Sequence, residues 1–197
     1  GGEPLHVVDR GGFALAPVGA RIAFSEGRDI MTLELSGDAE PERLARVRGG
    51  SGSLTWSPDG ARLAYVSNRG DHAFIGVLDI DADAITYLDP SVGRDGSPVW
   101  SPDGRSVAFL RIPNERVVHM FAPRREALPF SIRVADATTG EGREIWRARE
   151  GVGSAFSGVG ASNQLMWGAD NRVVFPWEGD GWKHLYSVPA RGGRATL

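Results

Sequence analysis

The stretch LTWSPDGARLAYV at residues 54–66 occurs again, 44 positions later, as PVWSPDGRSVAFL at residues 98–110. A weaker copy, ALAPVGARIAF, lies before them at residues 14–24. A fourth copy, LMWGADNRVVF, follows at residues 165–175 with a turn that is one residue shorter. The sequence therefore contains an internal repeat, and a period of about 40–45 residues is its strongest single indication of the fold.

Each copy has a tight turn at its centre. In the two best copies the turn is Ser-Pro-Asp-Gly, in which proline presets the backbone and glycine adopts a positive φ. Asp59 and Asp103 are expected to form this turn by accepting bonds from the backbone, rather than to act as acids or bases. Gly60 and Gly104 are expected to supply the positive φ. The residues after the turn alternate polar and apolar, which is typical of a half-buried strand.

Two more strands complete the unit. Residues 74–79 and 85–88 are apolar segments of strand length, joined by the acidic turn 80–84. Four antiparallel strands that repeat every 40–45 residues or so are typical of a β-propeller blade. We predict an all-β fold, a partial β-propeller of about four four-stranded antiparallel blades. The predicted blades cover residues 11–47, 52–90, 96–148 and 164–197. The tryptophans that share one place in the repeat are expected in the core between blades: Trp56, Trp100 and Trp167.

The composition excludes several classes of protein. Lys plus Arg is 22 and Asp plus Glu is 25, and this net charge of −3 is too mild for a dedicated nucleic-acid or membrane-surface binder. The absence of cysteine excludes disulfides, cysteine catalysis and thiolate metal sites. No apolar run approaches the length of about 18 residues that a membrane helix needs, and no segment resembles a signal peptide. The 27 glycines and 12 prolines favour short strands and many turns.

Catalytic and metal-binding patterns are weak. Neither glycine-rich string, residues 49–53 or 151–155, fits the Gly-x-Ser-x-Gly elbow that joins a strand to a helix in serine hydrolases. Asp79, Asp81 and Asp83 resemble the opening of a calcium loop, but the glycine and glutamate that such a loop requires are absent, so a hairpin turn is favoured. The histidines lack metal-ligand spacing. We expect no catalytic residue, no cofactor and no metal in this chain.

Loop residues are the better candidates for contact with a substrate. The third predicted blade carries an insertion at residues 113–130, and insertions in repeat folds form loops that often bind ligands. A charged loop exposed to solvent is the alternative. The substrate-proximal candidates are three charged residues of the insertion and one carboxylate of the fourth blade: Arg124, Arg125, Glu126 and Glu178.

The repeat resembles a known family. Trp-Ser-Pro-Asp-Gly followed by Ala-aromatic is similar to the PD40 (TolB-type) propeller repeat, which periplasmic TolB proteins share with the propeller domains of prolyl-oligopeptidase-type serine peptidases. The fourth blade resembles the dipeptidyl-peptidase-IV-like members of the S9 peptidases, through FPWE at residues 175–178, DGWKHLYSV at residues 180–188 and GGRATL at residues 192–197. The preceding GSAF at residues 153–156 and QLMW at residues 164–167 fit the same subgroup.

This resemblance implies a protein of two parts. In that family a propeller covers a C-terminal α/β-hydrolase domain that carries the Ser, Asp and His, and restricts substrates to short or N-terminally accessible peptides. Dipeptidyl peptidases hold the free amine of the substrate with a Glu pair on a propeller insertion. No adjacent Glu-Glu occurs here, so the resemblance assigns no amine anchor and no catalytic residue to this chain.

We therefore expect the non-catalytic propeller portion of such a peptidase, which gates peptide access and docks to its own C-terminal α/β-hydrolase domain. The alternative is a TolB-like PD40 propeller that binds another protein, and the third is a purely structural fragment. We expect no nucleic-acid or membrane partner, and a bacterial periplasmic or cytoplasmic location. The chain looks cut at both ends, and the bare faces of an open arc are expected to drive self-association.

Overall fold

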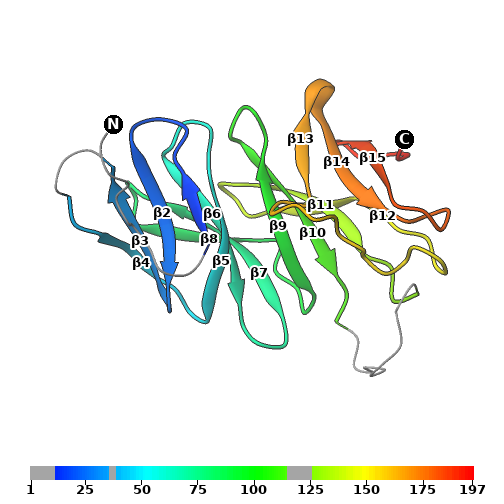
Figure 1. Ribbon diagram of the computed structural model, residues 1–197, viewed down its shortest axis with the longest axis horizontal. Helices are drawn as coiled ribbons and strands as arrows, with labels where there is room; N and C mark the ends of the chain where they lie inside the picture. Colours follow the sequence, from blue (N-terminus) through cyan, green and yellow to red (C-terminus); the bar gives the residue numbers. More distant parts are fainter. Residues whose placement is uncertain (1–11, 36–38, 115–125) are drawn as a thin grey trace.

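The computed structural model describes residues 12–35, 39–114 and 126–197 (Figure 1). Within these ranges the regular secondary structure is almost entirely β-strand, and the only helical segment is the short 3-10 turn η1 (Ala169–Asn171). Antiparallel sheets follow one another along the chain, which confirms the prediction of an all-β fold and a partial β-propeller. No helix in the described part of the chain is long and apolar enough to cross a membrane.

Each unit of the fold adds its strands antiparallel and in chain order. The first unit contains β1 (Phe13–Leu15), β2 (Arg21–Glu26), β3 (Asp29–Glu34) and β4 (Glu42–Arg46). The second contains β5 (Gly50–Trp56), β6 (Arg62–Asn68), β7 (Ala73–Asp79) and β8 (Ala84–Leu88). The third contains β9 (Arg94–Trp100), β10 (Ser106–Ile112), β11 (Ser131–Asp136) and β12 (Gly142–Arg147). The fourth contains β13 (Met166–Gly168), β14 (Arg172–Trp177) and β15 (His184–Pro189), and a single bridge from Ser187 to Thr196 continues it.

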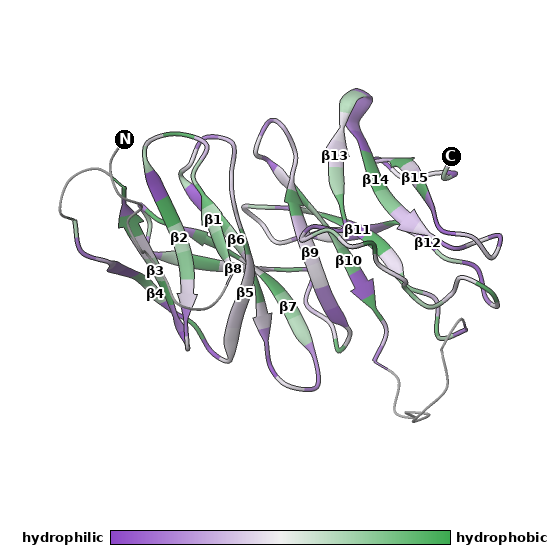
Figure 2. Ribbon diagram, viewed as in Figure 1, coloured by the Kyte–Doolittle hydropathy of each residue, from purple (hydrophilic) through white to green (hydrophobic). Residues whose placement is uncertain are grey.

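The second and third units form one continuous sheet. β7 pairs in parallel with β9 at Ala73 and Arg94, where the N–H of Ala73 donates to the carbonyl of Gly93 at 3.2 Å. The units lie side by side in an arc, in the order in which they occur along the chain (Figure 1). Apolar residues concentrate along the strands, and the connecting segments are mostly polar (Figure 2).

The antiparallel strand order gives the arc two distinct faces. The turns between first and second strands, and those between third and fourth strands, all lie at one edge, which we call the turn face. The loops between second and third strands lie at the opposite edge, which we call the loop face. The turn face carries residues 57–61, 80–83, 101–105, 137–141 and 168–171. The loop face carries residues 69–72, 113–114, 126–130 and 178–183.

The repeated turn is held by its own side chains. The hydroxyl of Ser57 donates to the Asp59 carboxylate at 2.5 Å, and the backbone N–H of Ala61 donates to the same oxygen at 3.1 Å. Gly60 has a φ of +71°, a conformation that glycine adopts without strain. The third unit repeats the arrangement with Ser101, Asp103, Gly104 and Arg105.

A tryptophan joins the second unit to the first, and another joins the third unit to the second. Trp56 is 6% exposed, and its indole N–H donates to the carbonyl of Ala14 in the first unit at 3.0 Å. Trp100 is equally buried and donates to Thr55 in the second unit, also at 3.0 Å. Both indoles therefore fill the space between successive sheets and satisfy their polar atom there.

An arginine from the preceding unit covers each of these two indoles. The guanidinium of Arg21 lies 4.6 Å from the ring centre of Trp56 and donates to the carbonyl of Gly60 at 3.1 Å. Arg62 makes the same two contacts with the third unit. Its guanidinium lies 5.2 Å from the ring centre of Trp100 and donates to the carbonyl of Gly104 at 2.6 Å. We call this pair of contacts the arginine clamp, since it joins stacking on the ring to a charged hydrogen bond.

Candidate functional site

A turn at Gly151–Ser154, the connector turn, anchors the end of the third unit's insertion on the loop face. Ser154 is fully buried, and its N–H donates to the carbonyl of Gly151 at 2.9 Å. Its hydroxyl accepts a bond from the N–H of Ala127 at 2.8 Å, and its carbonyl accepts one from Phe130 at 3.2 Å. The last residues of the insertion are therefore fixed to the segment that leads from β12 toward β13.

The connector turn also holds the loop between β14 and β15. The indole N–H of Trp177 donates to the carbonyl of Gly153 at 2.8 Å. Gly153 has a φ of +81°, and a Cβ at this position would lie 2.6 Å from the carbonyl oxygen of Glu178, so only glycine fits. Arg149 covers the Trp177 ring at 5.4 Å and donates to the carbonyl of Gly179 at 2.5 Å. Two loops from different units thus meet at one turn.

Aromatic side chains form the base beneath these loops. Trp146 lies 4.6 Å from Phe175 and 4.9 Å from Trp177, measured between ring centres. Tyr186 lies 5.0 Å from Trp177, and Phe130, at the end of the insertion, lies 5.5 Å from Trp146. Packed aromatic pairs of this kind hold a defined geometry, so the loops start from a rigid support.

The structure brings two of the four substrate-proximal candidates to the connector turn. Glu126 is exposed and directly precedes the segment bonded to that turn, whereas Glu178 is half-buried and its carbonyl lies against the turn. Arg124 and Arg125 lie outside the described residues. Contact of any of these residues with a substrate stays a prediction. The sequence analysis missed the connector turn, because its bonds link segments that are distant in the sequence.

Basic side chains line a second region of the loop face. A cleft of about 780 Å³ lies between the first and second units, and its cationic and imidazole groups come from Arg28, Arg48, Arg69 and His72. Arg69 is held in place by a bond from its guanidinium to the hydroxyl of Tyr87 at 2.8 Å. The cleft is suited to an anionic group such as a carboxylate. No motif marks these residues in the sequence, since they lie in loops of different units.

The acidic segment after β7 forms a hairpin turn. The carboxylate of Asp79 accepts a bond from the N–H of Ala82 at 3.0 Å, and Asp83 adopts a φ of +48°. These residues lead directly into β8 and so form the hairpin turn that the sequence favoured. Among residues 12–35, 39–114 and 126–197, no three His, Cys, Asp or Glu side chains gather in a way that could hold a metal ion.

A buried ion network, which the sequence did not reveal, stabilises the third unit against the second. Arg111 binds the carboxylate of Asp95 with two bonds of 2.6 and 2.7 Å. It also donates to Asp89 at 3.1 Å, and Arg133 donates to that same carboxylate. Burial raises the pKa of Asp95, and the bonds from Arg111 oppose this rise. Because every charge has a partner, the network is structural.

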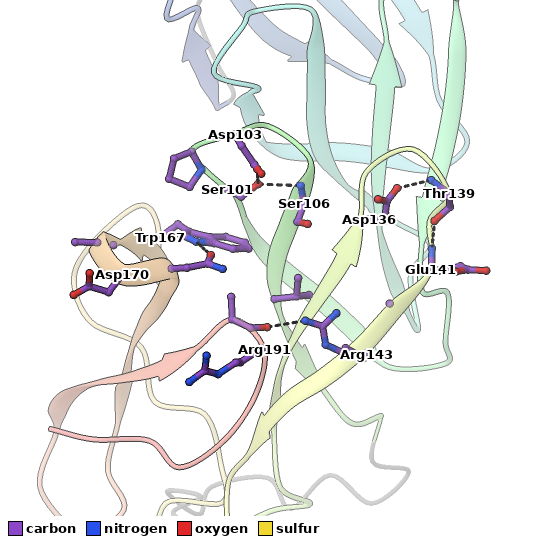
Figure 3. A pocket seen from close by; sticks show the side chains of 17 residues that line it. Ser101, Asp103, Ser106, Asp136, Thr139, Glu141, Arg143, Trp167, Asp170 and Arg191 are labelled. Carbon is purple, nitrogen blue, oxygen red and sulfur yellow. Dashed lines mark hydrogen bonds between the residues drawn. The ribbon is translucent and has the colours of Figure 1, made fainter.

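Trp167 forms a different hydrogen bond from Trp56 and Trp100. It is half-buried, and its indole N–H donates to the side chain of Asn171 at 2.8 Å, within its own unit. Its turn is one residue shorter than the others, which brings that side chain within reach. Trp167 packs partly against the core between the third and fourth units, but it also lines a cleft of about 850 Å³ on the turn face (Figure 3).

The sequence matches no family model and no curated protein. Its fold matches many solved structures, which include TolB proteins and several peptidases. A Mycobacterium tuberculosis puromycin-hydrolyzing peptidase is 21% identical with a TM-score of 0.64, over 90% of this chain and 27% of its own. An oligogalacturonate lyase in complex with manganese is 18% identical with a TM-score of 0.66, over 93% of this chain and 50% of its own.

A TolB-like protein is similar over a shorter part of the chain. The putative TolB from Agrobacterium tumefaciens is 21% identical with a TM-score of 0.53, over 71% of this chain and 50% of its own. This chain therefore spans half or less of the length of each of these three structures. The three carry different descriptions on one fold, so the likeness establishes a propeller module and not an activity.

Proposed function

We propose that this chain is the non-catalytic propeller portion of a dipeptidyl-peptidase-IV-like serine peptidase of the S9 family. In this role it limits access to peptides and docks on an α/β-hydrolase domain. The observation that carries the proposal is the connector turn, where an insertion and a loop of the fourth unit meet, each with a carboxylate. The resemblance of residues 175–188 to S9 peptidases supports it, as does the fold shared with the puromycin-hydrolyzing peptidase.

The charges of the loop face fit a short peptide. A peptide has a cationic amine at one end and a carboxylate at the other. Glu126 and Glu178 supply negative charge beside the connector turn, and the cleft with Arg28 and Arg48 supplies positive charge between the first and second units. Clefts lined by one sign of charge concentrate oppositely charged groups. A peptide with both ends free is the substrate class that this distribution favours.

The first test uses the whole protein that contains this chain. It is treated with a fluorophosphonate probe, which labels activated serines, and then assayed on dipeptidyl chromogenic substrates and on a folded protein. We expect labelling, cleavage of the short substrates and no cleavage of the folded protein. A folded, complete protein that takes up no probe would overturn the peptidase assignment.

The second test asks whether the two carboxylates recognise the amine. We expect Glu126→Gln and Glu178→Gln each to raise KM about tenfold for peptides with a free N-terminus, because a charged hydrogen bond is lost. KM for N-acetylated peptides should not change. Glu42→Gln, an exposed carboxylate on β4, is the control. Equal effects on both classes of peptide would separate these carboxylates from amine recognition.

A TolB-like propeller that binds another protein is the second candidate. It is favoured by the match to the Agrobacterium tumefaciens TolB, at the same 21% identity as the match to the peptidase. The complete gene separates the two candidates, since the peptidase requires a Gly-x-Ser-x-Gly elbow beyond these residues and the TolB-like protein requires none. The fluorophosphonate probe separates them at the level of the protein.

A further inference from the structure

One junction of the arc lacks the arginine of the clamp. The residue that begins the second strand is Arg21 in the first unit and Arg62 in the second, and both form the clamp. In the third unit the equivalent residue is Ser106. The carbonyl of Ser106 accepts a bond from the N–H of Ser101 at 2.8 Å, and the carbonyl of Arg62 accepts the same bond from Ser57 in the second unit. A serine is too short to reach the next unit.

The receiving side of the clamp is nevertheless present in the fourth unit. Trp167 has the same place in the repeat as the stacked indoles, and it pairs with Val173 as Trp100 pairs with Val107, although its N–H is bonded to Asn171. Asp170 has a φ of +55°, close to the +68° of Gly104, whose carbonyl receives Arg62. Asn171 follows Asp170, and its carbonyl accepts a bond from the N–H of Ala190 at 2.8 Å. In the third unit Arg105 follows Gly104, and its carbonyl accepts the equivalent bond from Ala137 at 2.9 Å. The ring and the equivalent turn carbonyl are therefore both in place without a guanidinium from the third unit.

A cleft lies where the missing side chain would be. Its volume is about 850 Å³, and both Ser106 and Trp167 line it. Trp167 lies on one side of the cleft and Asp136 and Glu141 on the other (Figure 3). The carboxylates in the lining come from Asp103, Asp136, Glu141 and Asp170, and the guanidinium groups from Arg143 and Arg191.

The electrostatics of the cleft favour a cation. The hydroxyl of Ser101 lowers the pKa of Asp103, and backbone N–H groups of the 138–139 turn lower the pKa of Asp136, so both stay ionised at neutral pH. Of the two arginines, Arg143 is engaged with the carbonyl of Ala190 at 3.0 Å. The lining holds four carboxylates and two guanidinium groups beside an aromatic face, which is an excess of negative charge.

We propose that this cleft binds a guanidinium group of a ligand in the place that Arg21 and Arg62 fill at the other junctions. The group stacks on Trp167 and donates to the carbonyl of Asp170, and the carboxylates at the rim attract it. The ligand is arginine, either free or as a side chain of a peptide. The site lies on the turn face, opposite the connector turn, and does not depend on the proposed peptidase role.

The binding test compares two ligands of the same shape. Isothermal titration calorimetry on the full chain uses N-acetyl-arginine amide and the citrulline analogue, in which a neutral urea replaces the guanidinium. We expect the arginine ligand to bind, and the citrulline ligand to bind about tenfold more weakly or less, because stacking and hydrogen bonding both lose the charge. Equal binding of the two, or no binding of arginine at millimolar concentration, would overturn the proposal.

A variant that restores the clamp tests the location of the site. Ser106→Arg should place the chain's own guanidinium over Trp167, raise the unfolding temperature and weaken binding of the arginine ligand about tenfold or more. Ser106→Ala, which removes only the hydroxyl, should leave binding unchanged. If Ser106→Arg does not fold, Trp167→Leu at the half-buried ring serves instead, with the same expected loss. A folded variant of either kind that binds arginine as before would contradict the assignment.

The source of the guanidinium is settled by further ligands. Tighter binding of a blocked Gly-Arg-Gly peptide than of free arginine assigns a peptide ligand, and the reverse order assigns a small molecule. Either order supports the site. Binding of a blocked Gly-Glu-Gly peptide in preference to both would mean that Arg191 and Arg143 hold an anion, and would overturn it.

Discussion

Tyr65 on β6 is fully buried, and its ring lies against the backbone of Gly76 on the neighbouring strand β7. The two residues are direct partners in the antiparallel pairing of these strands. A Cβ at Gly76 would lie 2.5 Å from the Cζ atom of Tyr65. The missing side chain of the glycine is therefore what lets the aromatic ring enter the core between the first and second units.

Gly76→Ala tests this fit. The added methyl group forces the buried ring or the strand to move, and overpacking of this kind costs about 1–3 kcal/mol of unfolding free energy. Gly52→Ala on β5 is a matched control, because a Cβ there meets nothing within 4 Å. Urea unfolding followed by tryptophan fluorescence measures both variants. Equal stability of the two would show that the ring adapts freely.

The repeated turns should make the fold sensitive to acid. The hydroxyl of Ser57 lowers the pKa of Asp59, and that of Ser101 lowers the pKa of Asp103, both from an ordinary value of 3.8. A carboxyl with a lower pKa in the folded state adds stability above its unfolded pKa, and this stability is lost as the pH falls through the folded pKa.

The double variant Asp59→Asn, Asp103→Asn tests the acid response. Its unfolding free energy should fall less steeply than that of the natural chain as the pH drops below about 4, because two of the titrating turns are gone. Urea midpoints measured at a series of pH values give the two slopes. Identical slopes would mean that the turn carboxylates do not contribute to acid unfolding.

At the level of single residues, the sequence predicted those interactions that join residues close together in the chain. Asp59 and Asp103 could be assigned to turns because their partners lie two residues away. The pairing of Asp95 with Arg111 could not, since the two lie on different strands and no turn signal links them. The bond from Trp167 to Asn171 could not be predicted, because its place in the repeat does not show that a side chain of its own turn lies within reach of the indole.

Strands and turns recur from unit to unit because the same local chemistry recurs. The Ser-Pro-Asp-Gly turn ends one strand and starts the next, so the first two strands of the second and third units could be predicted closely from the sequence. The clamp is less visible, because its arginine and its tryptophan are more than 30 residues apart. Ser106 stands out only once the contacts of Arg21 and Arg62 are known.

Arg62→Met measures how much the arginine clamp between the second and third units contributes to the free energy of unfolding. Methionine keeps the aliphatic length of the side chain but loses the stacked charge and the bond to Gly104. We expect the unfolding free energy to fall by about 1–2 kcal/mol. Arg105→Met, an exposed neighbour whose backbone alone serves the turn, should change it by less than about 0.5 kcal/mol. A loss as large in the control would point to a general effect of charge.

The candidate site shows the same division between what was predictable and what was not. Glu126 and Glu178 were chosen as candidates because they are carboxylates of loops outside the repeat, and their contact with a substrate stays a prediction. Their common neighbour, the connector turn, required the structure, because Ser154 and Gly153 bond to segments on both sides of them in the chain. The basic cleft likewise arises only when the first and second units lie together.

The whole molecule is an open arc, and its ends expose apolar side chains. Phe13 and Leu15 on β1 are 66% and 63% exposed, and Met166 and Leu185 of the fourth unit are also exposed. Closed propellers cover such surfaces with the neighbouring blade, and bare sheet faces and edges invite association.

We expect the 197-residue chain on its own to self-associate, with two arcs meeting at their bare ends. Light scattering coupled to size exclusion should give a mass above the 21.1 kDa of one chain, rising with concentration. Leu15→Glu at the exposed end should shift the equilibrium toward the single chain, whereas Ile85→Glu, on the outermost strand of the second unit, should not. A mass of one chain at all concentrations would contradict this prediction.

The backbone bond between Ala73 and Gly93 gives the arc uneven stiffness. This single bridge joins the second and third units through the backbone and so limits bending between them. In the described part of the chain, the hydrogen bonds that cross from the first unit to the second all involve a side chain, from Arg21, Ser51 or Trp56. Because no backbone bond among these described residues joins the first unit to the second, we expect this boundary to open more readily than the one between the second and third units. Such motion would widen the basic cleft, which is lined by residues of both units.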